Sequence, residues 1–151
     1  MNPQPGLPAL VLALTVGLGA CEVHSCPDVG CATQARLTGT IPAPEATAKL
    51  DVEYCSSKRC ITGQISVAAA DARNCIDGYG GSSVCLERRG DQLEVEAVMS
   101  GDVPREGDVY TLRLVELESS QVLCDEARTA HVTTTHDEDE CLTCTNASMN
   151  L

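Results

Sequence analysis

Apolar and polar residues alternate with a period of two along three segments of the chain. These segments are residues 48–55, with Ala48, Leu50, Val52 and Tyr54 on one face, and residues 60–67 and 92–99, which repeat the pattern. Successive side chains of a β-strand point to opposite faces of its sheet, so this alternation is typical of a strand with one buried face. We therefore expect half-buried strands at these positions.

Weaker forms of the pattern occur in residues 35–41, 84–88, 110–117, 130–135 and 146–151. Turn-forming sequences such as Asp77-Gly-Tyr-Gly-Gly and Arg89-Gly-Asp stand between them. No stretch of ten or more residues shows an apolar stripe at helical spacing. The sequence therefore predicts an all-β domain over residues 32–151, an antiparallel β-sandwich of seven or eight short strands stapled by disulfides.

Such a number of short strands in about 120 residues resembles the immunoglobulin-like sandwich. The resemblance is to the architecture alone, because the chain has no Trp and so lacks the Cys, Trp, Cys signature of antibody domains. No specific family is identified. Residues 71–83 have no strand pattern and contain several glycines. We expect them to form a long loop, stapled by the flanking Cys75 and Cys85.

The amino-terminal region has the pattern of an export signal. Residues 7–20 are apolar, but a membrane-spanning helix needs about 20 such residues, so a signal peptide is favoured. The run ends in Leu18-Gly19-Ala20-Cys21, which resembles the lipobox of bacterial lipoprotein precursors. No Lys or Arg precedes it, which departs from the usual positive start of a signal.

The lipobox resemblance implies removal of residues 1–20, alkylation of the Cys21 thiol with diacylglycerol and acylation of the new amino terminus, for example with palmitate. Residues 21–31 would then be a tether, and the domain would be held at a membrane of the cell envelope, on its periplasmic or cell-surface side. The alternative is a conventional secretory signal cut near Ala20, which leaves Cys21 available for a disulfide.

The net charge of −12 limits the classes of partner. So acidic a surface repels nucleic-acid phosphates and anionic lipid headgroups, and membrane attachment should therefore come from a lipid anchor rather than a basic patch. Another envelope protein is a compatible partner. The only aromatic residues are three Tyr, so the core must be built largely from aliphatic side chains and should be thin.

The ten cysteines indicate an oxidising compartment. The alternation places Cys55 and Cys60 on the outward faces of consecutive strands, where a hairpin would bring them together, and Cys75 with Cys85 is a second candidate pair. The remaining candidates are Cys26, Cys31, Cys124, Cys141 and Cys144, an odd number, so one thiol is left over if Cys21 carries lipid. A bridge from Cys26 or Cys31 to Cys141 or Cys144 would join the first and last strands, which we expect to lie side by side.

Two kinds of metal site are compatible with parts of the sequence. The spacing Cys141-Leu-Thr-Cys144, with His131 and His136 upstream, suits zinc, but exported cysteines oxidise to disulfides, which disfavours it. Calcium fits the oxygen-rich stretches better. Its candidate ligands are Asp71, Asn74 and Asp77, and Asp137 and Asp139 of an acidic run that is otherwise a solvated turn.

The sequence contains no nucleophile elbow, no metalloprotease motif and no phosphate- or dinucleotide-binding loop. We therefore expect neither an enzyme nor a cofactor. The leading hypothesis is a lipid-anchored envelope lipoprotein acting as a non-catalytic binding or structural module. The alternatives are a soluble exported calcium-binding or adhesion domain, and a hydrolase whose carboxylates come together only on folding.

Overall fold

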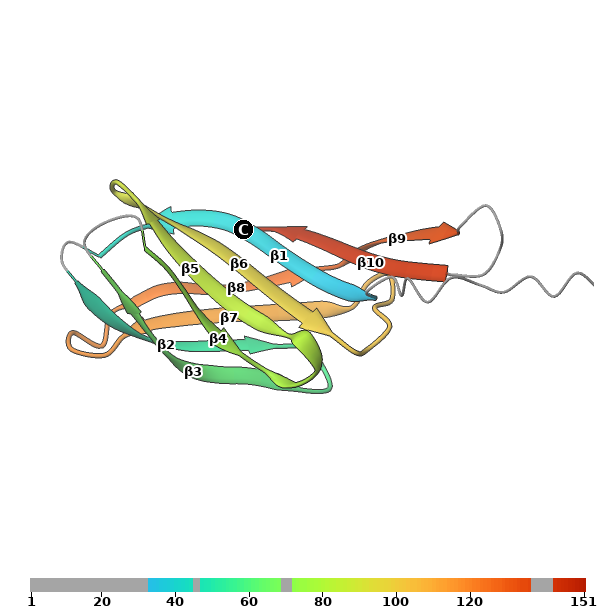
Figure 1. Cartoon of the computed structure of the whole chain (residues 1–151), viewed down its shortest axis with the longest axis horizontal. Helices are drawn as coiled ribbons and strands as arrows, with labels where there is room; N and C mark the ends of the chain where they lie inside the picture. The colour runs from blue at the N-terminus through green and yellow to red at the C-terminus, as the bar shows by residue number, and fades with distance from the viewer. Residues whose placement is uncertain (1–32, 45–46, 69–71, 137–142) are drawn as a thin grey trace, which may run out of the picture.

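The computed structural model describes residues 33–44, 47–68, 72–136 and 143–151. Within them, ten strands form two facing sheets (Figure 1). In spatial order, the six-stranded sheet contains β4 (Arg73–Asp77), β5 (Ser83–Arg89), β6 (Gln92–Ser100), β1 (Gln34–Pro42), β10 (Thr143–Asn150) and β9 (His131–His136). The four-stranded sheet contains β3 (Cys60–Val67), β2 (Ala48–Cys55), β7 (Val109–Glu116) and β8 (Val122–Thr129). A single 3-10 turn, η1 (Tyr79–Gly81), links β4 to β5 in this part of the chain.

The all-β prediction is confirmed, and the strongest alternating segments are strands with the expected inward faces. Residues 48–55 and 60–67 coincide with β2 and β3, and residues 92–99 lie within β6. The alternation succeeds here because one face of each strand packs against the opposite sheet while the other meets solvent.

The predicted count of seven or eight strands is too low, because two strands were missed. β4 lies inside residues 71–83, which were expected to be a loop, and it has only five residues. β8 has charged side chains on both faces, and a bulge shifts its register opposite Leu114 and Val115. Neither strand therefore carries a readable alternation of apolar and polar residues.

The first and last strands lie side by side, as expected. β1 pairs with β10 from Gln34 opposite Asn146 to Thr38 opposite Asn150. This pair is parallel, so the expectation of a purely antiparallel sandwich is wrong at this position. The parallel pair requires a long connection between its strands, and here the connection is the rest of the domain.

The core lies between the two sheets and is mostly aliphatic. Fully buried side chains include Leu37, Leu50, Leu86, Leu93, Leu112 and Leu114. Two of the three Tyr complete it: the rings of Tyr54 and Tyr110 stack with their centroids 6.0 Å apart. The hydroxyl of Tyr54 is buried and has no hydrogen-bond partner among the described residues, so this residue contributes through its ring alone.

Several connections gather at the end of the sandwich where β1 begins (Figure 1). The β2–β3 turn, η1 and the β6–β7 loop all lie there, and Thr33 lines the same hollow as Gly80, Gly81 and Val103. β9 and β10 extend past the other strands at this end (Figure 1). Among the described residues, no helix is long and apolar enough to cross a membrane.

The unpartnered hydroxyl leads to a stability prediction at Tyr54. Tyr54→Phe should change the free energy of unfolding by less than about 1 kcal/mol, or increase it, because an unsatisfied buried donor is removed. Tyr54→Ala should cost about 3–5 kcal/mol by opening a cavity. Urea unfolding of both variants measures the difference, and a large loss in Tyr54→Phe would show that the hydroxyl is hydrogen-bonded.

Candidate functional site

A hollow of about 340 Å³ lies on the outer face of the six-stranded sheet. Four neighbouring strands line it, with Thr38, Gly39 and Thr40 from β1, Glu94, Val95 and Glu96 from β6, Cys85 and Glu87 from β5, and Arg73 from β4. We call it the outer-face hollow. Its volume is at the lower end of the range of small-molecule sites, about 300–1,000 Å³.

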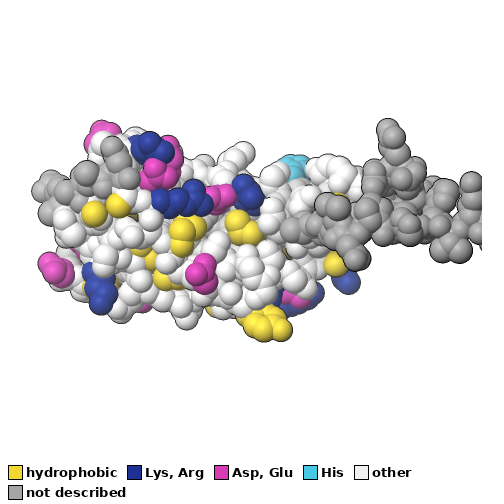
Figure 2. Space-filling model, in the orientation of Figure 1, with side chains coloured by type: hydrophobic (Ala, Val, Ile, Leu, Met, Phe, Trp, Pro, Cys, Tyr) yellow, Lys and Arg dark blue, Asp and Glu magenta, His cyan; other side chains and the backbone are white. Residues whose placement is uncertain are grey.

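Ion pairs join the strands around the outer-face hollow. Glu96 accepts from Arg36, with Nη1 to Oε1 at 2.8 Å, and also from Arg73. Basic and acidic side chains alternate along this face in Figure 2. Each Arg is half exposed, so each pair should contribute less than about 1 kcal/mol to stability.

Two carboxylates face each other across neighbouring strands in the outer-face hollow. Glu87 on β5 lies directly opposite Glu94 on β6, an arrangement that destabilises a sheet because the charges repel. Arg89 offsets the repulsion by pairing with both, at 2.5 Å from Nη2 to Glu87 Oε1 and at 3.7 Å from Nε to Glu94 Oε2.

The side chains of the outer-face hollow are mostly charged or hydroxyl-bearing. Its side chains can donate and accept hydrogen bonds and form ion pairs, and its only cysteine, Cys85, is bonded to Cys75. Any ligand with charged groups must compete with the existing pairs. The sequence pattern placed Glu94 and Glu96 on a polar face, but the convergence of four strands on one hollow depends on sheet order.

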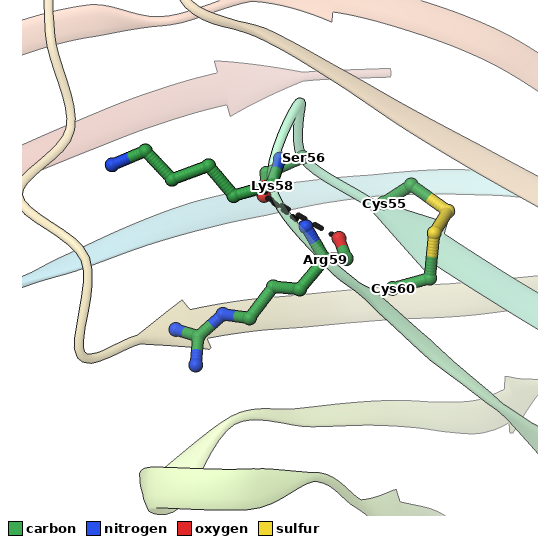
Figure 3. Close-up of a disulfide and its surroundings, with 5 residues drawn as sticks. All are labelled: Cys55, Ser56, Lys58, Arg59 and Cys60. Atoms are coloured by element: carbon green, nitrogen blue, oxygen red, sulfur yellow. Dashed lines mark hydrogen bonds between the residues drawn. A yellow bond between two sulfur atoms is a disulfide. The ribbon is translucent and has the colours of Figure 1, made fainter.

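The predicted Cys55–Cys60 disulfide is present and closes the β2–β3 hairpin (Figure 3). Ser56 fixes the turn: its Oγ accepts from the backbone N–H groups of Lys58 at 3.2 Å and Arg59 at 3.3 Å. The side chains of Lys58 and Arg59 extend away from the disulfide (Figure 3). Both reach Asp102 of the β6–β7 loop, at 3.8 Å and 3.2 Å, which ties the two connections together.

The predicted Cys75–Cys85 disulfide is also present, but its setting differs from the expected one. The two cysteines are directly opposed residues of the β4–β5 hairpin, so the bond staples paired strands rather than a long loop. Loop-closure entropy for so short a ring is worth about 2–3 kcal/mol. Cys144 is disulfide-bonded as well.

Cys124, which the sequence placed among the disulfide candidates, is not bonded. Its thiol is buried on the inner face of β8 and lies 3.8 Å from the carbonyl oxygen of Leu112. Burial, with a smaller contribution from Glu126, raises the pKa of this thiol. Cys124 is therefore a protonated core residue, and the polar appearance of β8 concealed this from sequence analysis.

The calcium candidates are only partly within the described residues. Asp71, Asp137 and Asp139 lie outside them, as do Cys21, Cys26, Cys31 and Cys141. Asn74 and Asp77 are three residues apart on β4 and so point to opposite faces of the sheet. The Asn74 amide donates to the Ser66 carbonyl at 2.9 Å. These two residues thus do not form a common ligand set.

The described residues of the zinc candidate do not form a metal site. His131 is exposed, with Nδ1 3.3 Å from Glu106 Oε1, and Cys144 is oxidised. Among the described residues, no three His, Cys, Asp or Glu side chains are grouped so as to hold a metal ion.

Comparisons with known proteins add no relative. No family model matches the chain, and no curated protein or solved structure matches it.

The raised pKa of Cys124 makes stability depend on alkaline pH. Above the ordinary thiol pKa of about 8.5, the unfolded thiol loses its proton while the buried thiol keeps it. Stability from this group is therefore complete below about pH 8.5 and is lost as pH rises toward the folded-state pKa. Burial also raises the pKa of Tyr54, which adds a further loss only above about pH 10.

We expect urea unfolding between about pH 8 and 9.5 to show this loss in the natural chain and a smaller loss in Cys124→Ala. Alkylation of Cys124 with iodoacetamide at about pH 8 should be at least about tenfold slower in the folded protein than in urea. Equal rates in the two states would contradict the burial of this thiol.

Proposed function

We propose that this chain is a lipid-anchored lipoprotein of a bacterial cell envelope, whose β-sandwich is a non-catalytic binding or structural module. The observation that carries the proposal is the position of Leu18-Gly19-Ala20-Cys21 at the end of an apolar run. The state of the other cysteines supports it in two ways.

First, the oxidised cysteines favour export. Five of the six cysteines within the described residues are in disulfides. Thiols of cytosolic proteins are kept reduced by cellular reductants, whereas disulfides persist in the periplasm and at the cell surface. A domain with a thin aliphatic core gains most from such cross-links, because their stabilisation is comparable with the whole stability of a small domain, about 5–15 kcal/mol.

Second, the number of cysteines favours a different use for one of them. The chain has ten cysteines, and Cys124 is unbonded. Nine remain, an odd number, so at least one other cysteine cannot form a disulfide within the chain. A thioether at Cys21 accounts for it and leaves eight cysteines, enough for four disulfides.

The surface chemistry supports the binding role. The outer-face hollow offers hydrogen-bonding and ion-pairing groups on a rigid sheet, and these side chains are already paired with one another. Such a surface suits recognition of a polar, charged partner such as another envelope protein. Its central strands are fixed on both sides by neighbouring strands, so the positions of these groups are well defined.

Intact mass of the mature protein, extracted from membranes with detergent, tests the anchor. We expect a chain that begins at Cys21 and carries diacylglycerol, and partition into the detergent phase. Cys21→Ser should move the protein to the soluble fraction, because both acyl chains of the diacylglycerol are lost, at about 0.8 kcal/mol per buried methylene.

Cys26→Ser is the matched control and should leave both lipid and partition unchanged. An unmodified Cys21 in the mature chain, or Cys21 recovered in a disulfide-linked peptide, would rule out the lipoprotein assignment in favour of a soluble exported domain.

A further inference from the structure

An unpaired edge strand exposes backbone N–H and C=O groups that can pair with another chain, and proteins usually protect such edges. The edge strands of the two described sheets are β4 and β9, and β3 and β8. Three of them contact a strand of the other sheet: β4 and β3 lie against each other, and β8 contacts β10. β4 is short and charged, and its Asn74 donates to the Ser66 carbonyl of β3. β8 carries a bulge and charged side chains, and Arg128 Nε donates to the Asn150 carbonyl of β10 at 2.9 Å.

β9 is protected at its start, where the β6–β7 loop lies against it, but it lacks these features from Thr133 to His136. Its six residues include no Lys, Arg, Asp, Glu or Pro, and its pairing with β10 continues without a bulge from His131 to His136. Three of its residues are exposed threonines, Thr133, Thr134 and Thr135, and β-branched residues favour the extended conformation. β9 also extends past the main body of the sandwich (Figure 1), and no described strand pairs with its outer edge.

The groups on that edge can be identified from one contact. The backbone N–H of Val132 donates to Glu106 Oε2 at 2.7 Å and therefore points away from β10. Alternate residues of an antiparallel ladder point the same way, so the backbone groups of Thr134 and His136 also face outward. The β6–β7 loop covers the start of this edge: Glu106 accepts from Val132, and the backbone of Gly107 and Asp108 bonds to Ala130. Within the part of the chain that the structure describes, no strand pairs with the edge from Thr133 to His136.

This arrangement is compatible with pairing between two copies. In an antiparallel pair, residues whose backbone groups face the partner strand must lie opposite one another. A two-fold axis at Thr134 meets this requirement. It places Thr134 opposite Thr134 of a second copy and Val132 opposite His136. The seam then contains only threonine, valine and histidine, so two chains that each carry a net charge of −12 would meet where no fixed charge lies on the strand.

The position of the tether also suits two copies on one membrane. Gln34, Asn146 and Thr133 lie in one row across β1, β10 and β9. In the pair, the two Gln34 residues would lie about 24 Å apart, five strand spacings of about 4.8 Å. Residues 21–33 can span up to about 45 Å when extended, so both anchors reach the same bilayer.

We propose that the outer edge of β9 binds a second copy of this chain. The two anchored domains then form a two-fold dimer at the membrane surface, and their six-stranded sheets join into one. The interface is small and the copies repel through their net charge, so pairing depends on the high effective concentration that the anchor supplies. To that extent it rests on the proposed lipid anchor. Glu106 opposes the pairing, because it occupies the Val132 N–H that the second copy needs.

Cysteine cross-linking tests the seam. The two-fold register brings Thr134 of the two copies within disulfide distance. We would oxidise the mature protein carrying Thr134→Cys, reconstituted in phosphatidylcholine vesicles, and measure the disulfide dimer on a non-reducing gel, with the linked peptide identified by mass. Lys49→Cys is the control, because Lys49 is also exposed but lies on β2, which is paired on both sides.

We expect at least about tenfold more dimer with Thr134→Cys than with the control, and about fivefold faster cross-linking when Glu106→Ala is added, since a competing hydrogen bond is removed. Equal dimer yields for the two cysteine variants would overturn the proposal. Cross-linking of the Thr134→Cys variant to a different envelope protein in native membranes, in place of a second copy, would also overturn it.

A failure of the anchor is distinguishable from a failure of the seam. If mass analysis shows no lipid, the same Thr134→Cys protein is oxidised in solution at about millimolar concentration, the effective concentration that tethering supplies, in low and high salt. A dimer that increases with salt, as screening of the net charge requires, supports the seam without the anchor. Its absence under both conditions overturns the proposal.

Discussion

The fold depends on burial of one aliphatic face of each sheet against the other. Leu37 and Leu93 from the six-stranded sheet and Leu50, Leu112 and Leu114 from the four-stranded sheet are fully enclosed, and only one stacked Tyr pair adds aromatic bulk. Because aliphatic side chains bury less area than rings, this core alone gives modest stability. The strict alternation in β2, β3 and β6 keeps the inner faces of these three strands apolar.

The cysteines compensate for the thin core at its periphery. The Cys55–Cys60 and Cys75–Cys85 bonds each join directly opposed residues of a hairpin, on the outward face where the aliphatic core does not reach. Cys124 differs because it faces inward from β8 and serves as a small core residue. Whether each of these cysteines is bonded depends on whether its side chain points outward or into the core. The other cysteines of the chain are then odd in number.

The two sheets differ in what they offer to partners. The six-stranded sheet has a charged outer face with the outer-face hollow at β1, β4, β5 and β6, and an edge at β9 that no described strand pairs with. These features lie at opposite sides of the same sheet, so a binding module could recognise a polar partner on its face while pairing with a second copy at its edge. The ion pairs of Glu96 and Arg89 keep the face electrically balanced in an otherwise acidic chain.

Sequence patterns were enough to predict the fold class, the inward residues of the clearly alternating strands, the two hairpin disulfides and the adjacency of the first and last strands. Most of this rests on local spacing, because side-chain direction in a strand is set by position parity. Other features became visible only in the folded domain: β4 and β8, the parallel direction of the β1–β10 pair, the burial of Cys124, the outer-face hollow and the position of β9 at a sheet edge. These depend on which strands become neighbours, and sheet order is fixed by long-range packing that no local pattern encodes.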